Sequence, residues 1–193
     1  MGRICYVNGI PYLVALPAGG QSRNDRDNQW NQMINCLISR YKDLDCINWR
    51  NMFSWCQEKT DSGGIVSRGF DTARTWGCFS SEYRSPGVGF RPVFIPLSPV
   101  TMQPDSSILD EIPDGERISF GSYYINKKIA TPPKNPTRLG DIPNYKLKAD
   151  ISFGSLQIGY GFHVIKMSGW LIADRILVKN ISWENLKDLG YTD

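Results

Sequence analysis

The sequence predicts an α+β protein, with two helices on twisted antiparallel sheets in the first half and a β-rich second half that ends in a helix. Three observations support this class. Apolar residues recur at helical spacing between residues 30 and 56. Runs of β-branched and aromatic residues occupy much of 65–94 and 117–173. Prolines then cluster between Pro96 and Pro104, where the composition changes.

The chain begins with a predicted β-hairpin. Two apolar runs, Ile4–Val7 and Ile10–Leu16, flank the dipeptide Asn8-Gly9. Both residues tolerate a positive φ, which a tight two-residue hairpin turn requires. We therefore expect antiparallel strands on either side of this turn.

Two helices are predicted from apolar residues spaced three and four apart, a pattern that forms one continuous apolar face. The first face contains Trp30, Met33, Ile34, Leu37 and Ile38. The second, shorter face contains Trp49, Met52, Phe53 and Cys56. The first face is expected to pack on the core rather than to bind a partner.

Residues 65–94 predict buried strands around a loop rich in glycine, serine and aromatic residues. Arginines recur along this stretch at Arg68, Arg74, Arg84 and Arg91. An arginine beside a strand glycine usually braces loop carbonyls or a carboxylate through its planar guanidinium. A structural role is thus the first expectation for these four residues.

The proline cluster places a domain boundary after residue 97. The predicted organisation is a first domain at 1–97, a Pro/Ser-rich linker at 98–110 and a β-rich accessory domain at 111–193. In the second domain, 162–167 and 170–173 predict a hairpin across Ser168-Gly169. Ser182 is expected to cap a final helix.

Charge and cysteine content exclude several classes of protein. The net charge of +3 comes without a basic run, so nucleic acid is not expected as a partner. No apolar run approaches the roughly 20 residues that a membrane helix needs, so no membrane is expected either. The five cysteines are an odd number and show no Cys-x-x-Cys spacing, so we expect no zinc site and a reducing compartment at synthesis. No metal or other cofactor is predicted.

No recognisable catalytic motif occurs in the chain. The one histidine, His163, lies in an apolar run and is expected to be a core residue. Nucleophile elbows, phosphate-binding loops and dinucleotide fingerprints are missing from the sequence. The protein is therefore predicted not to be an enzyme.

Several short motifs, taken in order, suggest a family. They are Gly19-Gly20, Asn28-Gln29-Trp30, Ser54-Trp55-Cys56-Gln57-Glu58, Arg68-Gly69, Ala73-Arg74 and Gly89-Phe90-Arg91-Pro92. Together they resemble the C-type-lectin-like fold of formylglycine-generating enzymes and of small Firmicute phage and prophage proteins. The resemblance covers about residues 1 to 97 and implies a C-type-lectin-like first domain.

The second half has a weaker resemblance of its own. Gly140–Tyr145, Leu171–Arg175 and Asn180–Trp183 resemble a small module that accompanies the lectin-like domain in the same phage proteins. The module usually precedes that domain, whereas here it follows. This resemblance implies no particular function.

The resemblance to the lectin-like fold implies a ligand-facing loop between residues 74 and 84. The candidate binding residues are Arg74, Thr75, Trp76, Phe79, Ser81, Tyr83 and Arg84. Aromatic and arginine side chains supply large contact areas at a small entropic cost, and serine adapts around them. The alternative is that Trp76 and Phe79 belong to the core and that only Tyr83 is exposed.

These observations favour a non-enzymatic recognition protein of a phage or prophage, most simply a virion component such as a tail, fibre or head-decoration protein. The alternative is an inhibitor of a host defence system, anti-CRISPR or similar, that binds a host protein. A degenerate oxidase of the formylglycine-generating type is less favoured, because Cys78 lacks the second nearby thiol which that copper chemistry uses.

The expected partner is a protein, of the virion or of the host, or a glycan. A homo-oligomer is compatible with the sequence. The expected location is the host cytoplasm at synthesis, and the virion if the protein is structural.

Overall fold

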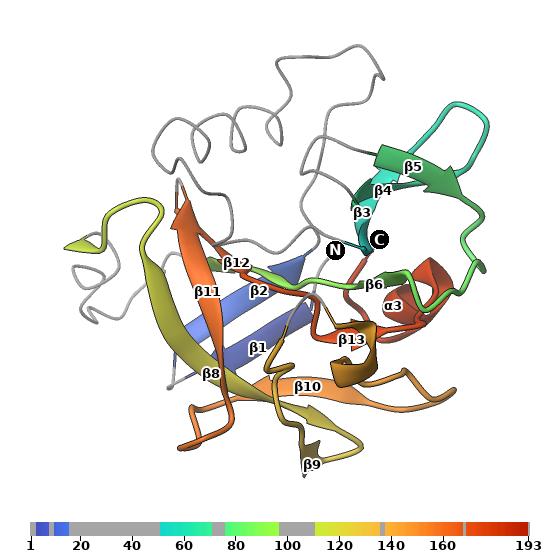
Figure 1. Cartoon of the computed structure of the whole chain (residues 1–193). Coiled ribbons are helices and arrows are strands. Elements are labelled where there is room, and N and C mark those ends of the chain that lie inside the picture. Colours follow the sequence, from blue (N-terminus) through green and yellow to red (C-terminus); the bar gives the residue numbers. More distant parts are fainter. Residues whose placement is uncertain are drawn as a thin grey trace.

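The structure, a computed structural model, is mostly β-sheet. It describes residues 3–7, 10–15, 51–70, 76–96, 111–135, 138–167 and 169–192. Within these ranges the strands form two sheets, and the one α-helix is α3 (Trp183–Asp188) near the C-terminus (Figure 1). A short 3-10 turn, η2 (Leu139–Asp141), lies between β9 and β10.

The larger sheet has eight strands, and its order along the sheet is β1-β2-β7-β12-β11-β8-β10, with β9 paired to β8. All of its pairings are antiparallel. The sheet curls into a half-barrel, since Cα atoms of β1 and β10, the two ends of this order, come within 8 Å of each other (Figure 1). The strands are β1 (Arg3–Val7), β2 (Ile10–Ala15), β7 (Val93–Pro96), β8 (Arg117–Ile125), β9 (Lys128–Ile129), β10 (Ile151–Gly154), β11 (Gly161–Met167) and β12 (Trp170–Ala173).

Two predicted hairpins are confirmed within this sheet. Val7 of β1 pairs with Ile10 of β2, as the Asn8-Gly9 turn requires. Met167 of β11 likewise pairs with Trp170 of β12. Local turn chemistry therefore determines these two pairings.

The smaller sheet has five strands in the order β13-β6-β3-β4-β5. Its pairings are antiparallel except for β3 with β6, which run parallel. Gly89 is required on β6, because a Cβ there would lie 2.6 Å from the carbonyl oxygen of Val178 on β13. The strands are β3 (Phe53–Lys59), β4 (Ile65–Gly69), β5 (Trp76–Phe79), β6 (Val88–Phe90) and β13 (Val178–Lys179).

Only two residues, Arg91 and Pro92, connect the end of β6 in the small sheet to the start of β7 in the large one. The Arg91 side chain is fully buried at this junction. Its Nε donates to Ser54 Oγ on β3 (3.2 Å), and its Nη1 donates to the carbonyl of Ala173 on β12 (3.1 Å). Arg91 therefore braces the two sheets against each other, in line with the structural role expected for these arginines.

The hydrophobic core is shared by the two sheets. One buried cluster contains Trp55 and Phe90 of the small sheet, Phe94 and Phe162 of the large sheet, and Trp183 of α3. Phe94 stacks on Phe162, with ring centroids 5.7 Å apart. Burial of these large aromatic side chains is the main driving force that holds the sheets together.

The predicted fold class, α+β with a C-type-lectin-like domain of two helices on sheets, is wrong. The predicted second helix through Met52, Phe53 and Cys56 is instead strand β3, with neighbours on both edges. Met52, Ser54, Trp55 and Cys56 are all buried. A strand buried on both faces carries apolar residues at successive positions, so three- and four-residue spacings arise without a helix. Trp49 and the predicted helix at 30–38 lie outside the described residues.

The predicted C-terminal helix is confirmed. Ser182 caps α3, because its Oγ accepts a hydrogen bond from the Asn185 N–H (3.1 Å), and the Asn185 side chain accepts one from the Ser182 N–H in return.

The predicted linker at 98–110 also lies outside the described residues. Strands from either side of it pair directly in the large sheet, where β7 lies between β2 and β12.

Candidate functional site

The predicted binding residues gather at the exposed edge of the small sheet. Trp76 begins β5 and Phe79 ends it, and β5 is an edge strand paired only with β4 among the described strands. Ser81, Tyr83 and Arg84 follow in the loop between β5 and β6. Arg74 and Thr75 lie outside the described residues.

Four aromatic rings form a row across this edge. Phe70 stacks on Phe53 (centroids 5.1 Å apart), Phe53 meets the edge of Phe79 (5.5 Å), and Phe79 stacks on Tyr83 (4.5 Å). We call Phe70, Phe53, Phe79 and Tyr83 the aromatic row. Its two ends are exposed, Phe70 at 41% and Tyr83 at 39%, whereas Phe53 and Phe79 between them are partly buried. The row therefore offers an accessible aromatic surface that is continuous with the core.

Small residues make room for this row on the sheet. Phe53 pairs with Gly69, and Ser67 pairs with Gly77. A Cβ on Gly77 would lie 3.2 Å from the Phe79 ring. The ring can therefore lie close over the β5 backbone because position 77 has no side chain.

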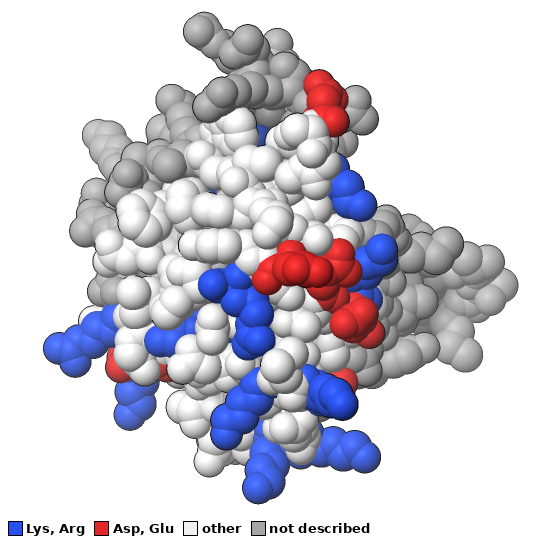
Figure 2. Space-filling view, turned by 90° about the vertical axis from the view of Figure 1, so that its right-hand side faces the viewer, with Lys and Arg blue, Asp and Glu red and all other residues white. Residues whose placement is uncertain are grey.

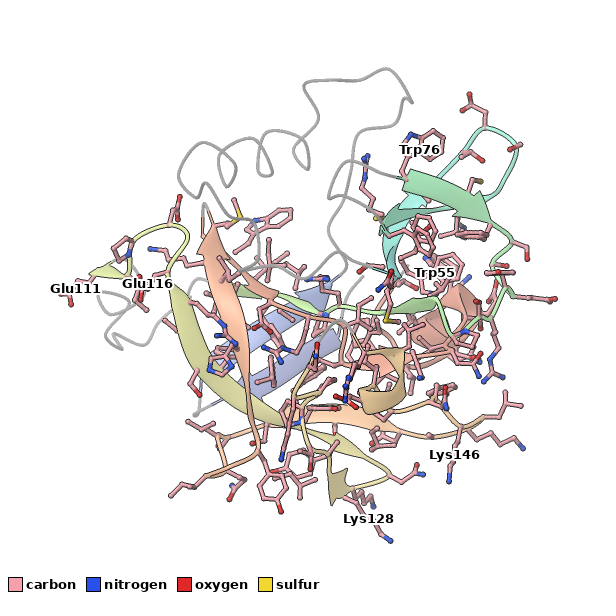
Figure 3. The ribbon with its side chains drawn as sticks, viewed as in Figure 1. Trp55, Trp76, Glu111, Glu116, Lys128 and Lys146 are labelled. Carbon is pink, nitrogen blue, oxygen red and sulfur yellow. The ribbon has the colours of Figure 1, made fainter. Side chains whose placement is uncertain are left out.

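Trp76 lies on the opposite face of the sheet from Phe79. Alternation along a strand places residues 76 and 79 on different faces. Figure 3 shows Trp76 on one side of β5 and Trp55, which contacts Phe79 edge-on at 6.0 Å, on the other. The side chains of Trp76 and Phe79 are both half-buried. They are therefore neither fully exposed in a ligand-facing loop nor fully buried in the core, the two alternatives left open by the sequence.

The backbone at Phe70 adopts an unusual conformation. Its φ is +82°, a value that bulky residues rarely adopt. Two backbone hydrogen bonds hold it there, from Phe70 N–H to the Met52 carbonyl (2.8 Å) and from Asn51 N–H to the Phe70 carbonyl (2.7 Å). Such strain costs about 1–3 kcal/mol and tends to cluster at active sites, ligand clamps and switch regions. The structure thus holds a bulky, exposed ring at a position where glycine would be less strained.

The loop that carries Tyr83 is held at several points. Arg84 donates from Nε to the Asn180 carbonyl (3.0 Å) and from Nη2 to the Tyr145 carbonyl (3.3 Å). The Ser81 carbonyl accepts a hydrogen bond from the Glu184 N–H in the first turn of α3 (3.1 Å). Arg84 therefore braces the loop, while Tyr83 projects from it.

Arg84 also affects the ionisation of Tyr145, whose ring centre lies 5.9 Å from its guanidinium. Burial raises the pKa of the Tyr145 hydroxyl, and the positive charge of Arg84 opposes that rise. Tyr145 is thus neutral at physiological pH.

Behind the aromatic row, two tryptophans connect β3 to the segment around α3. Trp55 Nε1 donates to the Ile181 carbonyl (2.7 Å), and Trp183 Nε1 donates to the Cys56 carbonyl (3.2 Å). Both indoles are buried, so both hydrogen bonds lie away from water. These reciprocal bonds give the row a rigid base.

Sequence reasoning missed half of the aromatic row. Phe53 was assigned to a helix face, and Phe70 was not identified as a candidate. Only Phe53, Ser54 and Trp55 alternate in this run, which is too short a signal to identify a strand that is buried on both faces. Nothing local to Phe70 indicates its exposure, because that depends on the pairing of β3 with β4.

The other candidate side chains do not form a catalytic constellation. The His163 side chain is half-buried beside the ion pair that Arg117 makes with Asp174 (2.8 Å). Cys78 is exposed, with its Sγ 3.7 Å from Thr60 Oγ1. Within the described ranges, no three His, Cys, Asp or Glu side chains group as a metal site would require. The same ranges contain no helix with the length and apolar character needed to cross a bilayer.

Comparison of the chain with protein-family models, with curated proteins and with solved structures found no match.

Proposed function

We propose that this protein is a non-enzymatic recognition protein that binds a partner protein through the aromatic row. The supporting observation is the continuous stack from Phe70 to Tyr83, exposed at both ends and braced from behind. Protein interfaces concentrate their binding energy in aromatic side chains that are held rigidly before the partner arrives.

The surroundings of the row suit such an interface. Ser80 and Glu82 are exposed and Ser81 and Ser85 are half-buried in the same loop, so a polar rim surrounds an aromatic centre. The strain at Phe70 adds to the argument, because strained backbone conformations cluster at active sites, ligand clamps and switch regions.

The resemblance of the short motifs to those of small phage and prophage proteins suggests two settings for this binding. The first is a virion component that attaches to another virion protein or to the host surface. The second is an inhibitor, made in the infected cell, that binds a host defence protein. The same surface serves either purpose, so the two settings differ only in the partner.

The test is capture of partners by the wild type and by two substituted proteins. Tyr83→Ser removes an exposed end of the row, whereas Tyr160→Ser removes an equally exposed tyrosine from the loop between β10 and β11. Removing an interface hot spot costs about 2 kcal/mol or more, which is roughly 30-fold in affinity. We expect Tyr83→Ser to lose the partner and Tyr160→Ser to keep it.

The captured protein then separates the two settings. A virion protein, together with detection of this chain in purified particles by mass spectrometry, supports a structural component. A host defence protein that is captured while particles lack the chain supports an inhibitor. Equal capture by both variants would overturn the proposal. Capture that a free glycan abolishes would also overturn it, because the protein would then bind a sugar and not the partner's polypeptide.

A further inference from the structure

Two tight turns lie side by side at one end of the large sheet. Asn126-Lys127 forms the two-residue turn between β8 and β9, and both residues have a positive φ (51° and 62°). The second turn runs from Lys146 to Ala149, whose N–H donates to the Lys146 carbonyl (2.9 Å).

Hydrogen bonds fix these turns against each other. The Asn126 N–H donates to the Asp150 carbonyl (2.9 Å), and the Asp150 N–H donates to Asn126 Oδ1 (3.0 Å). The pairing of Ile125 with Ile151 continues the contact into the sheet. The two turns therefore form one rigid corner, although about twenty residues separate them in the sequence.

This corner concentrates positive charge around one apolar side chain. Residues 126–128 and 146–150 contain four lysines and a single carboxylate, Asp150. All four lysines, Lys127, Lys128, Lys146 and Lys148, are exposed. Leu147, between two of them, is 69% exposed. We call these four lysines and Leu147 the lysine corner.

Two lysines of the lysine corner can be followed in Figure 3, in the lower part of the view. Figure 3 shows Lys128 and Lys146 projecting from the same end. Figure 2, a view turned by 90°, shows Lys and Arg side chains at the lower end of the molecule. Phe53 and Phe79 of the aromatic row lie instead on β3 and β5, in the other sheet.

The backbone of the corner favours glycine at two of these lysines. Lys127 and Lys148 have φ values of 62° and 64°, a region that glycine occupies without strain. A lysine at such a position supplies charge at some expense in stability. The backbone conformation therefore does not require lysine at either position.

We propose that the lysine corner binds the surface of a lipid bilayer that contains anionic phospholipids. Lysines near such a surface are attracted to the lipid phosphates and carboxylates, and an apolar side chain among them can enter the interface. Leu147 is placed for that role, because it protrudes at the tip of a turn between Lys146 and Lys148.

A bilayer fits the corner better than a nucleic acid does. Nucleic-acid surfaces usually contain arginines that bind base edges or exposed aromatic rings that stack on bases. The two turns carry lysines and a leucine instead. Lysine acts as a strongly hydrated point charge, which suits the diffuse potential of a lipid surface.

The experiment is co-sedimentation of the full chain with vesicles of phosphatidylcholine, prepared with and without phosphatidylglycerol. The test variant is Lys146→Gln/Lys148→Gln. The matched control is Lys59→Gln/Lys187→Gln, which removes the same charge from exposed positions beside α3. A third variant, Leu147→Ser, removes the apolar tip and leaves every charge in place.

We expect binding only to the vesicles with phosphatidylglycerol, and weaker binding at higher salt because counter-ions screen the attraction. Each lysine contributes roughly fivefold to the affinity, so the test variant should bind about 25-fold more weakly and the control much like the wild type. Leu147→Ser should weaken binding roughly tenfold.

Three results would overturn this inference. The first is no binding to anionic vesicles. The second is an equal loss in the control variant, which would show that only net charge matters. The third is binding to a labelled DNA duplex that depends on the lysines but not on Leu147, which would indicate a nucleic-acid surface. None of these results bears on partner binding at the aromatic row, because Tyr83 and Phe70 are unchanged throughout.

Discussion

At the scale of single residues, Phe70 combines an unfavourable backbone with an exposed ring. Its φ of +82° suits glycine and strains any residue that carries a Cβ. Its ring stacks on Phe53 and extends the aromatic row to its outer end. The outer end of the aromatic row is therefore held in a strained backbone conformation.

This strain predicts an unusual order of stability among substitutions of Phe70. Both Phe70→Ala and Phe70→Gly lose the stacking on Phe53, but only glycine relieves the positive φ. We expect the glycine variant to be more stable than the alanine variant by about 1 kcal/mol, the reverse of the usual order. Urea unfolding of both variants measures this difference. If alanine proved the more stable, the backbone at residue 70 would be relaxed.

His163 predicts how stability depends on pH. Burial lowers the pKa of its imidazole below the usual 6.5, and the nearby Arg117 lowers it further, although Asp174 opposes both. Below about pH 6.5 the unfolded chain therefore binds a proton that the folded chain does not, so acidification favours unfolding. The loss levels off once the pH falls below the folded pKa.

We expect thermal unfolding of the wild type to shift to lower temperature as the pH falls through this window. His163→Gln should show a shallower dependence over the same range, because it is the one histidine in the chain. Calorimetry at a series of pH values would measure both profiles. Superimposable profiles would mean that His163 titrates alike in the folded and unfolded states.

At the scale of elements, local chemistry predicted two hairpins and the C-terminal helix correctly but predicted a helix where the structure has strand β3. The hairpins at Val7–Ile10 and Met167–Trp170 and the capped helix after Ser182 follow from neighbouring residues, so the sequence was sufficient. Strand β3 was predicted as a helix, because a strand buried on both faces loses its alternation.

The candidate site shows the same limit. Phe79 and Tyr83 were identified from a loop rich in aromatic and polar residues, whereas Phe53 and Phe70 join them only through the pairing of β3 with β4 and of β4 with β5. The lysine corner was missed for a similar reason, since no segment of the sequence contains all four lysines.

Helix α3 supports the loop between β5 and β6, which carries Tyr83. Its cap depends on the Ser182 hydroxyl, and the Glu184 N–H in its first turn donates to the Ser81 carbonyl of the binding loop. Ser182→Ala should lower the free energy of unfolding by about 1 kcal/mol. It should also weaken partner binding, though less than Tyr83→Ser does, because the loop loses support but keeps its ring. Unchanged binding by the destabilised variant would show that α3 does not position the loop.

At the scale of the whole molecule, the two sheets are interdependent. Arg91 donates to β3 in one sheet and to β12 in the other, and its burial lowers the pKa of its guanidinium to about 9. A charged group at that depth persists only because its hydrogen bonds are made on both sides. We therefore expect that unfolding of one sheet destabilises the other.

This interdependence suggests an experiment on the predicted boundary at 98–110. A chain of two independent domains would unfold in two steps, and each piece would fold alone. In the structure, however, β7 from the first part pairs with β12 from the second, and the aromatic core contains residues of both parts.

We expect a single urea transition in which circular dichroism and tryptophan fluorescence coincide. Fragments 1–97 and 98–193 should each lack a cooperative transition, since cutting the chain exposes the edges of β7 and β12 together with half of the core. A fragment 98–193 that unfolded cooperatively by itself would instead establish the second part as an independent domain.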